Sequence, residues 1–83
     1  MEKIKIESIS ELKSMLSTDE PKDFAIINGL IRSSKSIMLN DDELIDVYNE
    51  VDDSTQVLTE KELFTESNIG EAIINGNFYF LSN

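Results

Sequence analysis

Carboxylates crowd one stretch of the chain, from Asp41 to Asp53, where seven of thirteen residues are acidic and none is basic. Side chains of this type can meet the Lys and Arg residues of a phosphate-binding groove, or supply oxygen ligands to a divalent cation. Repulsion between like charges opposes compaction, so apolar residues within the stretch must anchor it from behind. These residues are Leu44, Ile45, Val47, Tyr48 and Val51. We therefore expect an acidic surface on an apolar backing.

The residues predicted to contact a partner all belong to this acidic stretch. In a strand, Asp46 and Glu50 share a face with Tyr48 between them, and alternate positions lie about 7 Å apart. In a helix, Asp42 and Asp53 would join that face, with neighbours about 5 to 6 Å apart. Either spacing resembles that of successive phosphates, which indicates mimicry of nucleic acid; a solvated face that only keeps the domain soluble is the alternative. The predicted set is Asp41, Asp42, Glu43, Asp46, Tyr48, Glu50, Asp52 and Asp53.

Metal binding and catalysis are less favoured by the residues present. The carboxylates at 41–46 and 52–53 offer oxygen ligands, but the spacing and the glycine of an EF-hand loop are missing. The chain has no His and no Cys, which removes the usual general bases, thiol nucleophiles and thiolate ligands. Glu11-Leu12-Lys13 is similar to half of a metal-dependent nuclease motif but lies on an ordinary helix face. We expect no catalytic residue, no metal site, no cofactor and no enzymatic activity.

Two cations and three serines follow a turn glycine in the first half of the chain. Asn28-Gly29 precedes Arg32-Ser33-Ser34-Lys35 and then Ser36. Such a group can bind a phosphate or contact a partner's acidic patch. The second glycine of a P-loop is missing, however. The favoured interpretation is a solvated bulge whose cations pair with acids of this same protein.

Length and charge favour binding over chemistry. Eighty-three residues make a single domain over 1–83. The formal net charge is −10, and the excess lies in residues 36–83, which hold eleven acidic residues and one lysine. Such a surface repels nucleic acid and attracts basic grooves. There is neither an apolar run long enough for a membrane span nor a signal region, so we expect a cytoplasmic protein without membrane contact.

Short periodic segments predict the elements that position the acidic stretch. Residues 43–51 match both strand and helix patterns, and their β-branched content favours a strand. Capping pairs, Ser8 with Glu11 and Thr59 with Glu62, predict helix starts. Residues 55–58 are a candidate for a further short strand, which the predicted order does not include. The predicted order is β-α-β-β-β-α-β, an α+β domain with a mostly antiparallel sheet and helices on one face. Strands are expected at 3–7, 24–27, 36–39, 43–51 and 78–81, with helices at 9–17 and within 59–74.

Several short motifs lie between Phe24 and Phe80. They are Asn28-Gly29-Leu30, Arg32-Ser33-Ser34-Lys35, Asn49-Glu50, Asp52-Asp53-Ser54, Leu58-Thr59 and Ser67-Asn68-Ile69-Gly70-Glu71-Ala72-Ile73. With these motifs the chain resembles small uncharacterised proteins from bacterial phages and mobile elements, and in size and acidity it is similar to anti-CRISPR and anti-restriction inhibitors. The resemblance implies a mobile-element context. Together with the acidic stretch, it leads us to expect a protein that blocks the basic groove of a host nuclease or other nucleic-acid-binding protein, without touching nucleic acid itself. The alternative is an intracellular regulatory or assembly module that binds its partner through 28–35 or a sheet edge.

Overall fold

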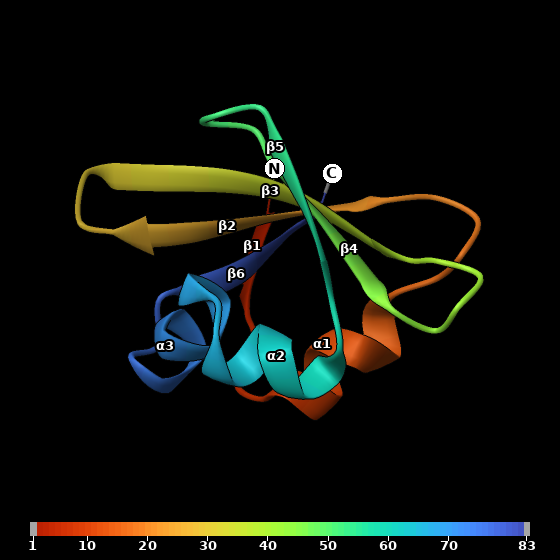
Figure 1. Ribbon diagram of the computed structural model, residues 1–83. Helices are drawn as coiled ribbons and strands as arrows, with labels where there is room; N and C mark the ends of the chain where they lie inside the picture. The colour runs from red at the N-terminus through yellow and green to blue at the C-terminus, as the bar shows by residue number, and fades with distance from the viewer. Residues whose placement is uncertain (1, 83) are drawn as a thin grey trace.

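Six strands within the described residues form one sheet, and in Figure 1 the three helices lie below it. A computed structural model of the chain describes residues 2–82. The elements are β1 (Glu2–Lys5), α1 (Ile9–Met15), β2 (Lys22–Asn28), β3 (Ile31–Leu39), β4 (Ile45–Asn49), β5 (Ser54–Leu58), α2 (Glu60–Thr65), α3 (Asn68–Ile74) and β6 (Phe78–Ser82). Every strand pair in the sheet is antiparallel.

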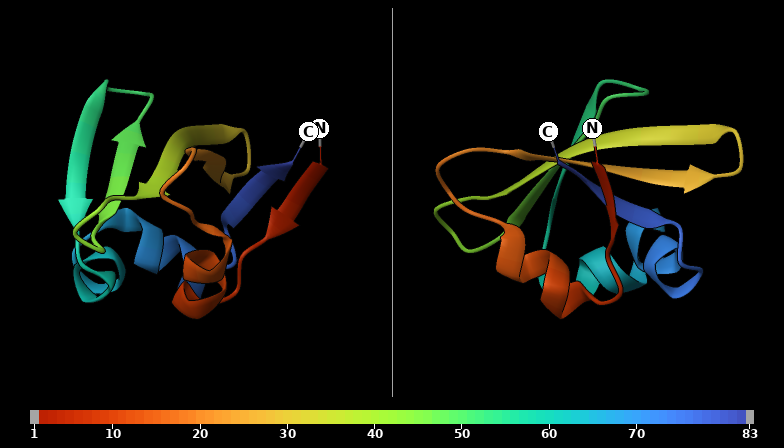
Figure 2. Two further views of the ribbon diagram at one scale, coloured as in Figure 1. Left: turned by 90° about the vertical axis from the view of Figure 1, so that its right-hand side faces the viewer. Right: turned by 180° about the vertical axis from the view of Figure 1, so that it is seen from behind.

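The last strand of the chain lies between the first two. The sheet order is β1-β6-β2-β3-β4-β5, which can be followed in the left view of Figure 2. β6 pairs with β1 through Lys3 and Leu81, and with β2 through Phe24 and Phe80. The two ends of the sequence are thereby joined in the sheet, whereas β2 to β5 follow one another as a meander. β1 and β5 are the two edge strands.

The core lies between the sheet and the helices. Phe24 and Phe78 stack at its centre, with ring centroids 5.4 Å apart and ring planes only 4° from parallel. Directly opposed residues in antiparallel strands point to the same face, so the register also places Ile37 and Val47 together on that face. Helical residues close the cluster from below. Its fully buried members are Ile6, Leu12, Phe24, Ile37, Ile45, Val47, Leu63, Ile69 and Phe78.

Side-chain caps start the three short helices, and two of these starts, at Ser8 and Thr59, are the predicted ones. Ser8 and Thr59 accept hydrogen bonds from the N–H groups of Glu11 and Glu62, and Thr59 with Glu62 completes a capping box. The Thr59 bonds lower the pKa of the Glu62 carboxyl, since they favour its charged form. Ser67 caps α3. None of these helices, within 2–82, is long and apolar enough to cross a membrane.

The α+β class and the antiparallel sheet are confirmed, but the predicted order of elements is wrong at two points. Residues 54–58 form β5, because they continue the meander by pairing with β4. The C-terminal helical segment is two helices, because Ser67 starts α3 directly after α2 ends at its C-cap, Glu66. β3 also begins earlier than expected, at Ile31, since Gly29 adopts a positive φ of 65° and permits a tight hairpin with β2.

The expectation that the central acidic stretch contains a strand is confirmed. β4 buries Ile45 and Val47 and turns Asp46 and Tyr48 to the other face. The competing helix would have had to bury residues three and four apart, whereas here alternate residues enter the core. The acidic stretch is thus a strand with a turn at each end.

Gly70 allows α2 and α3 to approach closely, because a Cβ atom there would lie 1.9 Å from the backbone oxygen of Phe64. We predict that Gly70→Ala destabilises the protein by about 3 kcal/mol or more, since a backbone atom cannot move aside as a side chain can. Denaturant unfolding measures this. Glu71→Ala, at the exposed neighbouring position, is the control and should change stability by less than about 0.5 kcal/mol; equal stability of the two variants would contradict the close approach.

Candidate functional site

The predicted site residues form two groups at opposite ends of β4. Asp41, Asp42 and Glu43 lie in the turn that precedes the strand, and Glu50, Asp52 and Asp53 lie in the turn that follows it. Five residues of extended chain separate the turns by about 17 Å. The carboxylates therefore line an extended border and do not surround one point. Among residues 2–82, no group of three or more acidic side chains is placed to hold a metal ion.

Asp46 and Tyr48 connect the strand to its two turns. Asn40 Nδ2 donates a hydrogen bond of 3.1 Å to Asp46 Oδ1, next to the first turn. Tyr48 Oη donates a hydrogen bond of 2.6 Å to Asp53 Oδ1 in the second turn. This bond and the negative charge of Asp53 raise the pKa of the Tyr48 phenol. The structure therefore brings Asp46 toward one group of acids and Tyr48 toward the other.

Two acids of the stretch have left-handed backbone conformations. Glu43 has a φ of 63° and Asp53 a φ of 56°. Outside glycine this conformation costs roughly 1 to 2 kcal/mol, because Cβ approaches a carbonyl oxygen. Asp tolerates it better than Glu, since a short side chain can bond to the local backbone. Glu43 is thus the more strained residue, in a turn that glycine would form more easily.

Asp52 is held by Ser54 in the second turn. Its Oδ1 accepts hydrogen bonds from Ser54 Oγ at 2.7 Å and from Ser54 N at 3.2 Å. The hydroxyl bond is the main cause that lowers the pKa of the Asp52 carboxyl, and the positive charge of Lys35 adds a smaller effect. Asp52 therefore belongs to the acidic stretch and also faces a second polar region beneath the sheet.

Lys35 occupies an unexpected position, because its residue is only 3% exposed. It does not extend into solvent as a bulge residue would; the register with Phe24 on β2 and Asn49 on β4 places it on the helix-facing side. Its Nζ donates to Asn49 Oδ1, and Asn49 Nδ2 in turn donates to Ser54 Oγ at 3.2 Å. Burial lowers the pKa of the Lys35 ammonium.

Strand alternation was the sequence signal for this position. Ser33, Lys35, Ile37 and Leu39 alternate along β3, and Ile37 is buried. A strand extended back from Ile37 would have placed Lys35 on the buried face. The signal was missed because the strand was expected to begin at residue 36.

A polar hollow of about 370 Å³ opens beside Lys35, where the apolar part of the sheet ends. Asn49, Ser54 and Gln56 contribute to it from β4 and β5, and Asp52 comes from the hairpin between them. Glu66, Ser67 and Asn68 contribute from the junction between α2 and α3. The hollow thus combines one buried cation, amides, hydroxyls and two acids.

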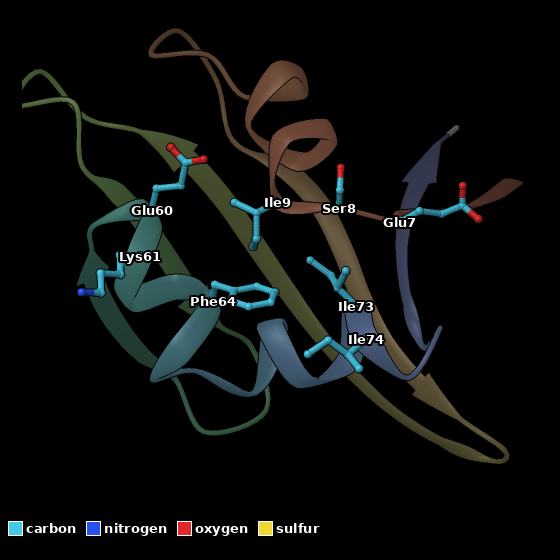
Figure 3. A pocket seen from close by; sticks show the side chains of 8 residues that line it. All are labelled: Glu7, Ser8, Ile9, Glu60, Lys61, Phe64, Ile73 and Ile74. Carbon is cyan, nitrogen blue, oxygen red and sulfur yellow. The ribbon is translucent and has the colours of Figure 1, made fainter.

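An apolar groove of about 820 Å³ lies between the start of α1 and the helices α2 and α3. Figure 3 shows Ile9, Phe64 and Ile73 converging from three helices, with Glu7 and Lys61 pointing outward on opposite sides. Phe64 is 41% exposed here, although it is a large apolar residue of the kind that usually lies in a core, and Ile74 is 71% exposed. The reason is that neighbouring residues on a helix point about 100° apart, so Leu63 takes the core position and Phe64 cannot.

Comparisons with known proteins do not assign a function to these surfaces. The chain matches no protein-family model, no curated protein and no solved structure. What the acidic stretch, the polar hollow and the apolar groove can bind therefore follows from their own geometry and charge.

The strained turn before β4 can be tested directly. We predict that Glu43→Gly raises the free energy of unfolding by about 0.5 to 1 kcal/mol, because the relief of the left-handed conformation exceeds the entropy that glycine adds to the unfolded chain. Asp42→Gly is the matched control, since the φ of Asp42 is not positive. That variant should lose stability. Equal effects of the two substitutions in denaturant unfolding would refute the strain at Glu43.

Proposed function

We propose that this protein is a small non-enzymatic inhibitor, encoded by a phage or mobile element, that blocks a host nucleic-acid-binding defence enzyme of the kind targeted by anti-CRISPR or anti-restriction proteins. The acidic stretch would occupy the basic groove that otherwise holds nucleic acid. The observation that carries the proposal is the extended border of carboxylates along β4 and its two turns, backed by the buried Ile45 and Val47.

The charges of the acidic stretch are available to a partner. The stretch contains no basic residue, and the ion pairs Lys13–Glu60 and Lys22–Glu20 both lie outside it. Carboxylates spaced along a strand would contact a row of Lys and Arg residues and release bound counterions, as phosphates do. Tyr48, 38% exposed between the two groups of acids, is suited to anchor such an interface.

The strain at Glu43 also supports a role for its side chain. Residues held in rarely populated backbone conformations persist where the surrounding structure imposes them, and they gather at functional sites. An acid in place of the favoured glycine adds charge to the first turn at some cost in stability. This combination is expected where charge is selected for binding.

We predict that Asp46→Lys with Glu50→Lys weakens binding to the target by at least ~100-fold, because like charges would then face each other across the interface. The target is captured from lysate, identified and purified. Its binding is then measured over a range of salt concentrations and in competition with duplex DNA and RNA. Binding that falls steeply with salt and is displaced by nucleic acid is the expected result.

The control carries the same change in net charge elsewhere on the surface. Asp19→Lys with Asp23→Lys alters two exposed acids outside the acidic stretch and should retain nearly full affinity. If both double variants lose affinity equally, net charge and not the acidic stretch is responsible. If binding resists salt and nucleic acid, mimicry is excluded.

A second candidate function is a regulatory or assembly module that binds a protein through the apolar groove. It is favoured by the exposed side chains of Phe64 and Ile74, two large apolar groups on neighbouring short helices. A module that binds its partner through both Arg32 and Lys35 is less favoured, because Lys35 is buried on the opposite face of its strand from Arg32.

We predict that Ile74→Asp separates the two functions. It places a charge in the groove without touching the core, so a partner held by apolar contact should be lost and the fold retained, as checked by thermal unfolding. Electrostatic capture through the acidic stretch should survive this change. Loss of the same partner in both Ile74→Asp and the Asp46/Glu50 variant would show that neither surface acts alone.

A further inference from the structure

We infer that the polar hollow beside Lys35 is a binding site for a small molecule of the α-amino acid class, with the carboxylate of the ligand on Lys35 and its ammonium group between Asp52 and Glu66. The site lies on the helix-facing side of the sheet and does not rest on the proposed inhibitory function, although it shares Asp52 with the acidic stretch at its border.

Lys35 is a buried cation that feels the negative charge of Asp52 but forms no direct ion pair with it. It forms no salt bridge with any residue among 2–82. Among these described residues its one hydrogen-bond partner is Asn49 Oδ1, although an ammonium group has three N–H donors. Removing a charge from water is costly unless it is paired, so such a group provides a strong site for an incoming anion. The hollow is where that anion can enter.

The neighbours of Lys35 are already oriented. Asn49 Nδ2 donates to Ser54 Oγ and lies 3.5 Å from Gln56 Oε1, which turns the carbonyl oxygen of Asn49 toward Lys35. This arrangement fixes the ammonium without neutralising it. A ligand carboxylate can therefore accept the remaining Lys35 N–H groups while the Asn49 contact stays in place.

The acids at the border of the hollow determine which charge the ligand carries besides its carboxylate. Asp52 and Glu66 both line it, so its charged side chains sum to one positive and two negative. A multiply charged anion such as phosphate would meet repulsion from both acids, whereas a zwitterion is attracted at each end. Asp52 uses Oδ1 to bind Ser54, which leaves Oδ2 for an ammonium group.

The dimensions agree with a small ligand. A hollow of about 370 Å³ lies near the lower end of ligand-binding pockets. It corresponds to the volume of roughly twelve water molecules in the liquid. An amino acid fits this space, and the polar lining of Ser33, Gln56 and Asn68 suits a polar rather than a large apolar side chain.

The test is a titration followed by NMR of the backbone amides of the intact protein. L-alanine and L-glutamine are compared with propionate and ethylamine, which carry the carboxylate or the ammonium group alone, and with inorganic phosphate. At least one amino acid should give saturable shifts around Lys35, Asn49 and Ser54 with a Kd of about 1 mM or tighter. The single-charge probes and phosphate should bind at least ~10-fold more weakly.

Two variants assign the charges. Lys35→Met should abolish binding and retain or raise thermal stability, because it removes a buried unpaired charge and keeps the volume; Lys61→Met, on exposed α2, is its control. Asp52→Asn lies at the surface and should weaken amino-acid binding while leaving that of propionate unchanged. The inference fails if no amino acid gives saturable shifts, if phosphate or propionate binds as well, or if either variant binds as the parent does.

Discussion

Phe24 stacks on Phe78 where β2 and β6 meet, next to the pairing of β6 with β1. Placing β6 between β1 and β2 closes a long stretch of chain and loses the corresponding entropy. Burial of the two aromatic rings stabilises this pairing and offsets the loss of entropy. Residues of the meander β2 to β5 and of the helices pack into the same core as these rings.

The same sheet face has two chemical characters, and this division creates the polar hollow. Near α1 and α2 it presents Ile45 and Val47, which the helices cover. Farther along, the register replaces them with the row Lys35, Asn49 and Ser54. The junction between α2 and α3 lies against that row, whose polar groups bond to one another and line an opening.

The other two surfaces, as proposed, would bind through different forces. The charge of the acidic stretch would act over distance and be screened by salt, and so would favour rapid association with a basic partner. The apolar groove acts at contact and depends on removing Phe64 and Ile74 from water. A domain of this size has little interior in which a deep cleft could form. The candidate binding surfaces accordingly lie on strands, turns and helix faces.

Local patterns in the sequence determined the starts of α1 and α2 and the strand type of β4. The Thr59 and Glu62 capping box works through neighbouring atoms, and the alternating, β-branched residues Ile45 and Val47 favour a strand over the competing helix. Of the candidate site, the acidic composition of the stretch and its strand conformation were readable in the same way.

Only the tertiary structure decided which residues from different elements meet. Lys35 is hidden because its strand pairs with both Phe24 and Asn49, and Phe64 is exposed because Leu63 reaches the core first. The insertion of β6 between β1 and β2 and the separation of the acids into two turns have the same origin. The burial of Lys35 and the place of β6 depend on pairing between residues distant in sequence, whereas capping and alternation depend only on near neighbours.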